Sequence, residues 1–301
     1  MDYLDLKKAK MAYQKGENVT EFLRSEFNVQ SNTSEIIEIA YDLQAGSYIE
    51  RCIENIESAT NYAQVLSSLL EPHIFKECSI LDVGAGELTT LSLIANQLDQ
   101  RVSEIHAFDI SWSRLWHGLE FWQNTVTRKD LDLLPFVADM KQIPLASKSI
   151  DLVTSNHALE PNGANLETLL SEIFRVCKKT CVLFEPSYES NSAAGKERMD
   201  SLGYIKGMEE KIKLLGGKLI DFHLISKPIN PHNPTACFVI EPPLQNFSTT
   251  SFNKFSVPGT NFLLERENDF MISSDTGLAF PILKKIPILK KDSAILATSL
   301  F

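Results

Sequence analysis

Short apolar runs alternate with helical periods between residues 78 and 241. Runs of aliphatic, β-branched and aromatic residues bounded by turn-forming residues are typical of buried strands. Seven runs fit this description: residues 79–83, 104–109, 134–138, 150–155, 181–185, 219–225 and 236–241. Strands that alternate with helices indicate βαβ crossovers. The pattern therefore predicts an α/β fold with a doubly wound, mostly parallel seven-stranded sheet.

Helical periods flank and separate these runs. Over residues 49–70, apolar side chains recur at the spacing of one helical face, which predicts one helix of several turns packed on the core. A second strong period covers residues 166–177, after the fourth strand. A further helix, residues 199–215, is expected to end at Gly216-Gly217. The first 35 residues give only weak helical patterns.

These patterns divide the chain into four parts. We expect residues 1–70 to form an N-terminal helical segment that covers the ligand site of the sheet. Residues 71–242 are expected to form the α/β domain. Residues 243–260 are rich in Pro, Ser, Thr and Asn without a sustained period, which predicts a linker. Residues 261–301 form a small β-containing tail module with strand-like runs at 278–283 and 286–289.

Composition narrows the class of protein. Of the 301 residues, 44% are hydrophobic and 23% are charged, which is ordinary for a folded globular chain. The net charge of −10 repels nucleic-acid phosphates, and the three Lys-Lys pairs are short enough to be surface charge. No run approaches the ~18 apolar residues of a membrane span, and the first ten residues are charged. We therefore expect a cytoplasmic protein without a membrane segment or a nucleic-acid partner.

Cysteine and histidine spacing does not point to a metal site. The five cysteines are scattered and none forms a CxxC pair, so we expect reduced, structural thiols: Cys52, Cys78, Cys177, Cys181 and Cys237. The histidines outside the strand ends show no paired ligand spacing either. No metal is predicted.

A glycine-rich turn follows the first predicted strand, in the segment Ile80–Thr90 (ILDVGAGELTT). Asp82 closes the strand, and Gly84 and Gly86 let the backbone turn tightly and a ligand approach closely. A dinucleotide site would have a third glycine at position 89, where this chain has Thr89. The motif therefore indicates either another nucleoside ligand or simply a tight strand-to-helix turn.

Acidic residues follow the next two strands as well. Asp109 lies 25 residues after Gly84, where a carboxylate can accept from ribose hydroxyls, and Asp139 is placed to meet an adenine amino group. S-adenosylmethionine (AdoMet) has a ribose and an amino-acid group but no pyrophosphate, so these acids suit it better than a dinucleotide. Strand-end acids also serve as helix caps, which is the alternative for both residues.

The ordered set ILDVGAGELTT, AFDIS, VADM and SIDLVTSNHALEPN resembles the motif series of class I AdoMet-dependent methyltransferases across residues 40–241. The upstream segment YDLQAGSY, residues 41–48, is similar to the aromatic-rich segment that many of them fold over the cofactor. The resemblance implies AdoMet as cofactor and a Rossmann-like methyltransferase fold. The implied cofactor-binding residues are Tyr41, Tyr48, Asp82, Gly84, Gly86, Asp109, Ile110, Asp139, Met140 and Asn156.

Polar residues after the fourth and fifth strands are the candidates for catalysis. His157 has an ordinary pKa near 6.5 that suits a general base, and Glu160 can orient it or bind the acceptor. Glu185 follows the fifth strand and faces the same crevice. Each has a structural alternative: His157 as a hydrogen-bonded loop residue, Glu160 as part of a tight loop, and Glu185 as a polar residue at a strand end.

The sequences NHALEPN and LFEPSYE also look like a bacterial methyltransferase subgroup associated with surface-carbohydrate biosynthesis. In that subgroup the tail resembles a small zinc-ribbon-like module, but the cysteines expected near Ser256–Thr260 are absent, so zinc is not expected. The tail is expected to be a lid or a docking element, including one for a homodimer. The favoured function is methyl transfer to O or N of a polar small molecule. The alternatives are an RNA or protein methyltransferase, or an AdoMet-binding protein without turnover.

Overall fold

Seven strands form one sheet at the centre of the computed structural model, which describes residues 3–226, 232–244 and 255–300. The strand order is β3-β2-β1-β4-β5-β7-β6. Strands β1 to β5 run parallel to one another, whereas β7 pairs antiparallel with both β5 and β6. The strands are β1 (Ile80–Val83), β2 (Glu104–Asp109), β3 (Asp132–Val137), β4 (Ile150–Asn156), β5 (Cys177–Pro186), β6 (Lys218–Leu224) and β7 (Thr235–Glu241).

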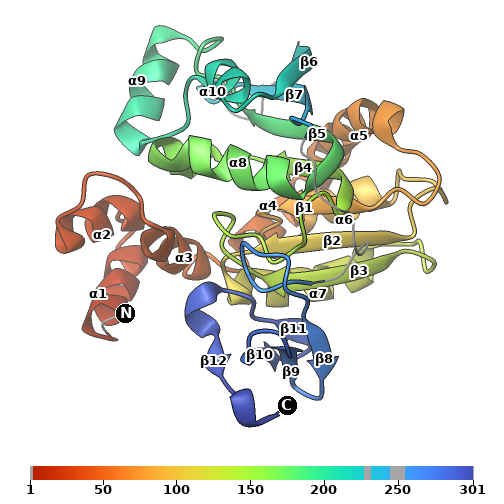
Figure 1. The fold of residues 1–301 in the computed structure, drawn as a ribbon. Coiled ribbons are helices and arrows are strands. Elements are labelled where there is room, and N and C mark those ends of the chain that lie inside the picture. Colours follow the sequence, from red (N-terminus) through yellow and green to blue (C-terminus); the bar gives the residue numbers. More distant parts are fainter. Residues whose placement is uncertain (1–2, 227–231, 245–254, 301) are drawn as a thin grey trace.

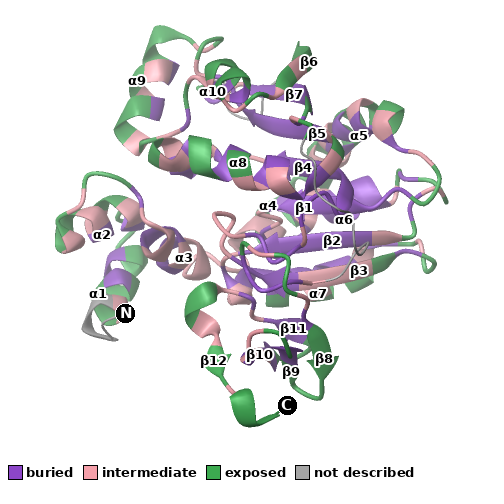
Figure 2. Ribbon diagram, viewed as in Figure 1, coloured by how far each residue is buried: buried purple, intermediate pink, exposed green. Residues whose placement is uncertain are grey.

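All seven predicted strands are present, so the predicted mostly parallel, seven-stranded sheet is confirmed (Figure 1). The apolar runs were informative because both faces of the sheet are covered, as expected for parallel strands. Strand β1 is buried at every position, and the sheet is mostly purple in Figure 2. Strand β6, at the edge, is the exception and is largely exposed.

Helices cover both faces of the sheet. One face packs against α8 and α10 and against residues of the C-terminal tail, and the other packs against α4, α5, α6 and α7. Helices α1 to α3 form a separate small core and lie at the left of Figure 1. The helices are α1 (Tyr3–Gln14), α2 (Val19–Phe27), α3 (Ser34–Asp42), α4 (Ser47–Glu54), α5 (Ile56–Leu70), α6 (Thr89–Ala95), α7 (Trp112–Thr125), α8 (Leu166–Val176), α9 (Ala193–Leu202) and α10 (Met208–Leu214).

The single helix predicted over residues 49–70 is wrong. The chain breaks at Asn55, whose φ of −124° and ψ of 36° are not helical, and α4 and α5 lie on either side. The Asn55 amide donates to the carbonyl of Arg51, a local bond that competes with the helix. Ile53 and Ile56, counted in the apolar face, are 60% and 47% exposed. Apolar spacing alone did not reveal the break.

The helix predicted over residues 199–215 is also two helices. Gly203 and Gly207 have φ values of 68° and 70°, and they end α9 and precede α10. Such left-handed conformations favour glycine and interrupt a helix. Helix α8 ends at Val176, so Cys177 begins β5 rather than continuing the helix.

The C-terminal tail forms a small antiparallel sheet beside β3, below it in Figure 1. Its strands are β8 (Glu265–Glu267), β9 (Phe270–Ser273), β10 (Leu278–Leu283), β11 (Ile286–Pro287) and β12 (Ile295–Leu296). The small β-containing tail is thus confirmed. Residues 245–254 of the predicted linker lie outside the described residues. Within the described ranges, none of the helices is both long and apolar enough for a membrane span.

Candidate active site

The glycine-rich turn joins the end of β1 to the start of α6. Gly84 and Gly86 have φ values of 67° and 56°, which favour glycine. A Cβ on Gly84 would lie 2.5 Å from the Cβ of Ala158, and one on Gly86 would lie 2.6 Å from Nη2 of Arg114. Both glycines are therefore required by backbone conformation and by close packing.

Asp109 holds this turn from the end of β2. Its Oδ2 accepts the backbone N–H of Gly86 at 2.9 Å, and its Oδ1 accepts the N–H of Ser111 at 2.9 Å. The side chain that caps α7 is Ser111, which accepts from the N–H of Arg114 at 3.2 Å. Asp109 is therefore not the helix cap, and each oxygen has a second lone pair available for a ligand hydroxyl.

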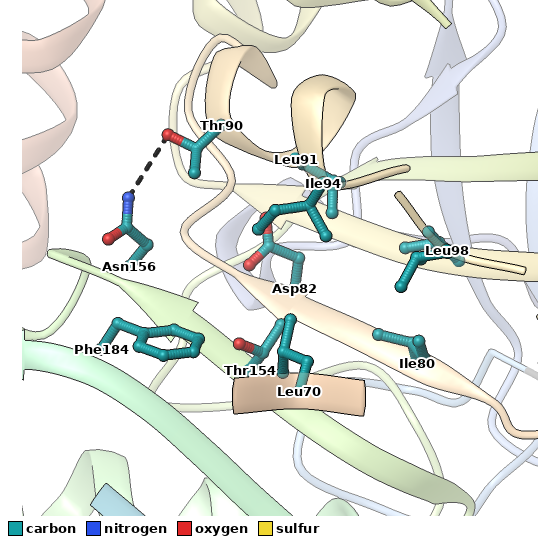
Figure 3. A pocket seen from close by; sticks show the side chains of 11 residues that line it. Leu70, Ile80, Asp82, Thr90, Leu91, Ile94, Leu98, Thr154, Asn156 and Phe184 are labelled. Carbon is teal, nitrogen blue, oxygen red and sulfur yellow. Dashed lines mark hydrogen bonds between the residues drawn. The ribbon is translucent and has the colours of Figure 1, made fainter. Parts of the chain in front are cut away.

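Asp82 points into a narrow pocket between β1 and α6 (Figure 3). The pocket is mainly apolar, and its polar side chains are Asp82, Thr90, Thr154 and Asn156. The carboxylate of Asp82 is buried and has no hydrogen-bond partner among the described residues. Burial, followed by the charges of Asp109 and Glu185, raises the pKa of Asp82 to about 8. A buried acid without a partner is suited to a cationic ligand group such as an ammonium.

Asn156 lines this pocket and directly precedes His157 in the chain. Its Nδ2 donates to Oγ1 of Thr90 at 3.4 Å, drawn in Figure 3, and its Oδ1 accepts from the hydroxyl of Tyr62 at 2.8 Å. Burial raises the pKa of Tyr62, so this hydroxyl remains protonated. Tyr62 comes from α5, and no sequence motif indicates its role.

Met140 and Asp139 follow β3 at the same edge. The N–H of Ala138 donates to the carbonyl of Asp109 at 3.1 Å, which brings the two strand ends together. Cε of Met140 lies 3.6 Å from the Cβ position on Gly84. Asp139 accepts from the N–H of Lys141 at 2.9 Å, and Ile110 is partly exposed directly after Asp109. The cofactor roles of Asp139, Met140 and Ile110, like those of the other predicted cofactor residues, stay predictions.

Tyr41 and Tyr48 reach the turn through Arg114. The guanidinium carbon lies 5.1 Å from the ring centre of Tyr41 and 4.5 Å from that of Tyr48. Burial raises the pKa of both tyrosines, so their hydroxyls are protonated. Sequence reasoning selected both tyrosines but missed Arg114, and it quoted Glu87 in the motif without assigning it a role.

His157 and Glu160 form a close pair after β4. Nδ1 of His157 lies 2.6 Å from Oε2 of Glu160, and Nε2 lies 2.7 Å from Oγ1 of Thr235. Asn233 also donates to Oε2 of Glu160, at 2.9 Å. Burial lowers the pKa of His157, but the hydrogen bond and charge of Glu160 outweigh burial, so the pKa is raised. Because a carboxylate only accepts, Nδ1 carries a proton and Nε2 is the atom that can exchange one.

The conformation of His157 is unusual. Its φ is 53°, in the left-handed region that non-glycine residues seldom adopt. Such conformations concentrate at functional sites, where surrounding bonds hold them. Here the N–H of His157 donates to the carbonyl of Phe184 at 2.9 Å.

Glu185 shapes the loop that carries His157. Its Oε1 accepts from the hydroxyl of Ser155 at 2.7 Å and from the N–H groups of Ala158 and Leu159 at 3.0 and 3.1 Å. Burial raises the pKa of Glu185 to about 7, and Oε2 is buried without a partner among the described residues. Direct contact of Glu185 with an acceptor stays a prediction, and its bonds give it a positioning role.

The described residues contain no group of three or more His, Cys, Asp or Glu side chains arranged to hold a metal. The five cysteines are buried and none forms a disulfide.

Residues 81–184, from the glycine-rich turn to the end of β5, match the profile of a family described as a methyltransferase domain. The strand order with one antiparallel strand, β7, and acids at the ends of β1 and β2 agrees with that match. This part of the chain is a class I methyltransferase domain. Its cofactor is S-adenosylmethionine.

Solved structures with this fold come from several sources. A chain of the Haloferax volcanii complex between the Trm112 methyltransferase activator and a protein assigned as a methyltransferase is 18% identical, with a TM-score of 0.51, covering 68% of this chain and 98% of that one. A Methanosarcina mazei SAM-dependent methyltransferase is 13% identical, with a TM-score of 0.49 and coverage of 59% and 98%. The geranyl diphosphate C-methyltransferase of Streptomyces coelicolor, solved with S-adenosyl-L-homocysteine, is 10% identical, with a TM-score of 0.46 and coverage of 60% and 77%.

At these identities, the solved structures show the fold of the methyltransferase domain alone. No curated protein matches the sequence significantly.

Proposed function

We propose that this methyltransferase transfers the methyl group of AdoMet to an oxygen or nitrogen atom of a polar small molecule. The observation that supports this most directly is the His157–Glu160 pair, which lies one residue beyond the pocket residue Asn156. A hydroxyl or an acidic N–H acceptor must lose a proton during methyl transfer, so it needs a proton-accepting group beside it. An acceptor without such a proton needs no base.

The residues of the site have separable roles in this proposal. Bound AdoMet supplies an activated methyl group. Asp82 would accept from the ammonium of the amino-acid group, and Asp109 would accept from the ribose. With AdoMet bound, His157 would take at Nε2 the proton that the acceptor atom loses as it receives the methyl group from sulfur. Glu160 keeps the Nδ1 proton in place and stabilises the imidazolium that forms.

The polar groups around His157 indicate the class of the acceptor. The buried Asn233 and Thr235 and the partly buried Glu160 surround His157 with polar groups, which suits an acceptor that makes several hydrogen bonds. A sugar or a nucleotide-linked intermediate of surface-carbohydrate biosynthesis fits this polarity and the NHALEPN and LFEPSYE resemblance. The net charge of −10 favours a small molecule over RNA.

Location and partners belong to the same proposal. A cytoplasmic enzyme without a nucleic-acid or membrane partner is favoured, and a homodimer through the C-terminal tail is the proposed assembly. A protein acceptor recognised by the tail is the alternative, because the tail lies beside β3. Deletion of residues 243–301 tests the tail: loss of dimerisation or turnover with retained AdoMet binding would assign it to recognition.

Binding and turnover test the enzyme itself. Calorimetry should show S-adenosyl-L-homocysteine binding in about the micromolar range, and labelled AdoMet should methylate a member of a panel of sugars and sugar nucleotides. His157→Gln should keep binding but lower turnover by about 100-fold or more. His117→Gln, an exposed histidine on α7, is the matched control. Absence of binding by the wild type, or full turnover by His157→Gln, would refute the proposal.

A further inference from the structure

Arg114 is a buried cation in the first turn of α7, and it lies against the glycine-rich turn. It is 8% exposed. Its Nη1 lies 3.8 Å from Oδ2 of Asp109, and its Nε lies 3.7 Å from Oε1 of Glu87. The faces of Tyr41 and Tyr48 lie against the same guanidinium. Arg114 thus contacts two acids of the cofactor side and two aromatic rings of the N-terminal segment.

These contacts leave the guanidinium without a hydrogen bond among the described residues. Nε of Arg114 and Oε1 of Glu87 are both buried and lack a partner. Separations of 3.7 and 3.8 Å are too long for hydrogen bonds, so the attraction is that of charge for charge and of charge for ring face. Leaving donors unmade in the interior is costly. Arg114 is therefore held by its attraction to the two acids and the two ring faces rather than by hydrogen bonds.

The N-terminal segment is attached at two other points, one on Glu87 of the glycine-rich turn and one at the start of α7. We call residues 41–49 the closing segment. The N–H of Ile49 donates to Oε2 of Glu87 at 2.9 Å. The carboxylate of Asp42 accepts from the hydroxyl of Ser111 at 2.7 Å and from that of Ser113 at 3.0 Å. The closing segment is bound at both ends, and Arg114 lies against the tyrosines near each end.

We propose that Arg114 is a positioning residue that latches the closing segment onto the glycine-rich turn, so that cofactor entry and release require this contact to open. Nη2 of Arg114 lies 2.6 Å from the Cβ position on Gly86, and Nη1 faces the acid that is proposed to bind the ribose. A ligand at Asp109 therefore meets the guanidinium. The cofactor part of this inference rests on the proposed role of Asp109, whereas the latch itself does not.

Hydrogen exchange of the ligand-free protein tests the latch. In Arg114→Gln, amides of residues 46–52, including that of Ile49, should exchange about tenfold faster than in the wild type. Arg114→Lys keeps the charge but loses the planar group that stacks on the rings, so an intermediate rate is expected. Arg51→Gln is the matched control, because Arg51 lies 5.6 Å from the Tyr48 ring but is exposed. Amides of residues 46–52 in Arg51→Gln should exchange at the wild-type rate.

The dissociation rate of S-adenosyl-L-homocysteine tests whether the Arg114 contact controls cofactor release. Release from Arg114→Gln should be at least fivefold faster than from the wild type, with a smaller change in association, and Arg51→Gln should match the wild type. Unchanged exchange in both Arg114 variants overturns the latch. Faster exchange with unchanged release overturns its control of the cofactor. If the wild type binds no S-adenosyl-L-homocysteine, the proposed function fails, and the exchange result still decides the latch.

Discussion

The backbone N–H of Leu289 donates to the carbonyl oxygen of Val137 at 2.7 Å, which joins the C-terminal tail to the edge of the main sheet. Val137 is the last residue of β3, and Ile288 forms a parallel bridge with it. The tail thereby covers an edge that would otherwise be open for pairing. The next residue of the tail, Lys290, bonds to Glu38 on α3 at 2.7 Å. One short stretch of the tail therefore contacts both the end of β3 and the N-terminal helix α3.

The Lys290–Glu38 pair gives the first prediction. Burial raises the pKa of Glu38 even though Lys290 lowers it, so the pair is largely removed from water. Lys290→Met leaves this carboxylate without its partner and should lower the free energy of unfolding by roughly 1–3 kcal/mol. Urea denaturation measures the change. Glu38→Gln in the same chain should restore part of the loss, and Lys291→Met, at an exposed neighbour, should have little effect.

Asp82 gives the second prediction. Asp82→Asn replaces a buried acid without a partner by a neutral side chain of the same shape, so thermal stability at pH 8 should be equal to or higher than that of the wild type. Calorimetric affinity for S-adenosyl-L-homocysteine should fall about tenfold or more, because the ammonium loses its carboxylate. Equal affinity in both proteins would remove Asp82 from the cofactor site.

The strands and the glycine-rich turn were predictable because their signals are local. Gly84, Gly86 and Asp109 lie within one strand-turn-helix-strand unit, and the structure brings them together. Arg114 was not predictable in the same way. Its partners Tyr41 and Tyr48 lie more than 60 residues away along the chain, and an arginine in the first turn of a helix is usually a surface residue.

The helix breaks show a second limit of sequence reasoning. At Asn55 the apolar spacing continues across the break, so periodicity could not locate it. The contact between Val137 and Leu289 was also hidden, because backbone hydrogen bonds between distant segments carry no side-chain pattern. Tertiary packing decides such features, and only the structure shows them.

Glu160 gives the third prediction. Glu160→Gln removes the negative charge that raises the pKa of His157, so that pKa should fall below its ordinary value under the effect of burial. Imidazole proton shifts followed by NMR against pH measure it. A raised folded-state pKa stabilises the protein fully below the unfolded pKa, and the stabilisation is lost as pH rises through the folded pKa. The variant should therefore lose stability mainly at pH 6 and below; an unchanged His157 titration would contradict the assigned pairing.

The pH dependence of stability gives the fourth prediction. The pKa of Asp82 is raised to about 8 and that of Glu185 to about 7, both by burial first. For an acid with a raised folded pKa, the folded protein holds more protons than the unfolded chain, so stability falls as pH rises through the folded pKa. The ligand-free protein should lose on the order of 4 kcal/mol between pH 6 and pH 8.5.

Urea denaturation at the two pH values, in the wild type and in Asp82→Asn, tests this assignment. Asp82→Asn should show a smaller loss of stability, which comes from Glu185 and His157. The reason is that Asp82, the carboxyl with the higher pKa, has been removed. Asp130→Asn is the control, since that exposed acid has a lowered pKa set by its hydrogen bond to Arg128 and titrates well below this range. A wild-type stability that stays level or increases up to pH 8.5 would show that Asp82 is ionised in the folded, ligand-free protein.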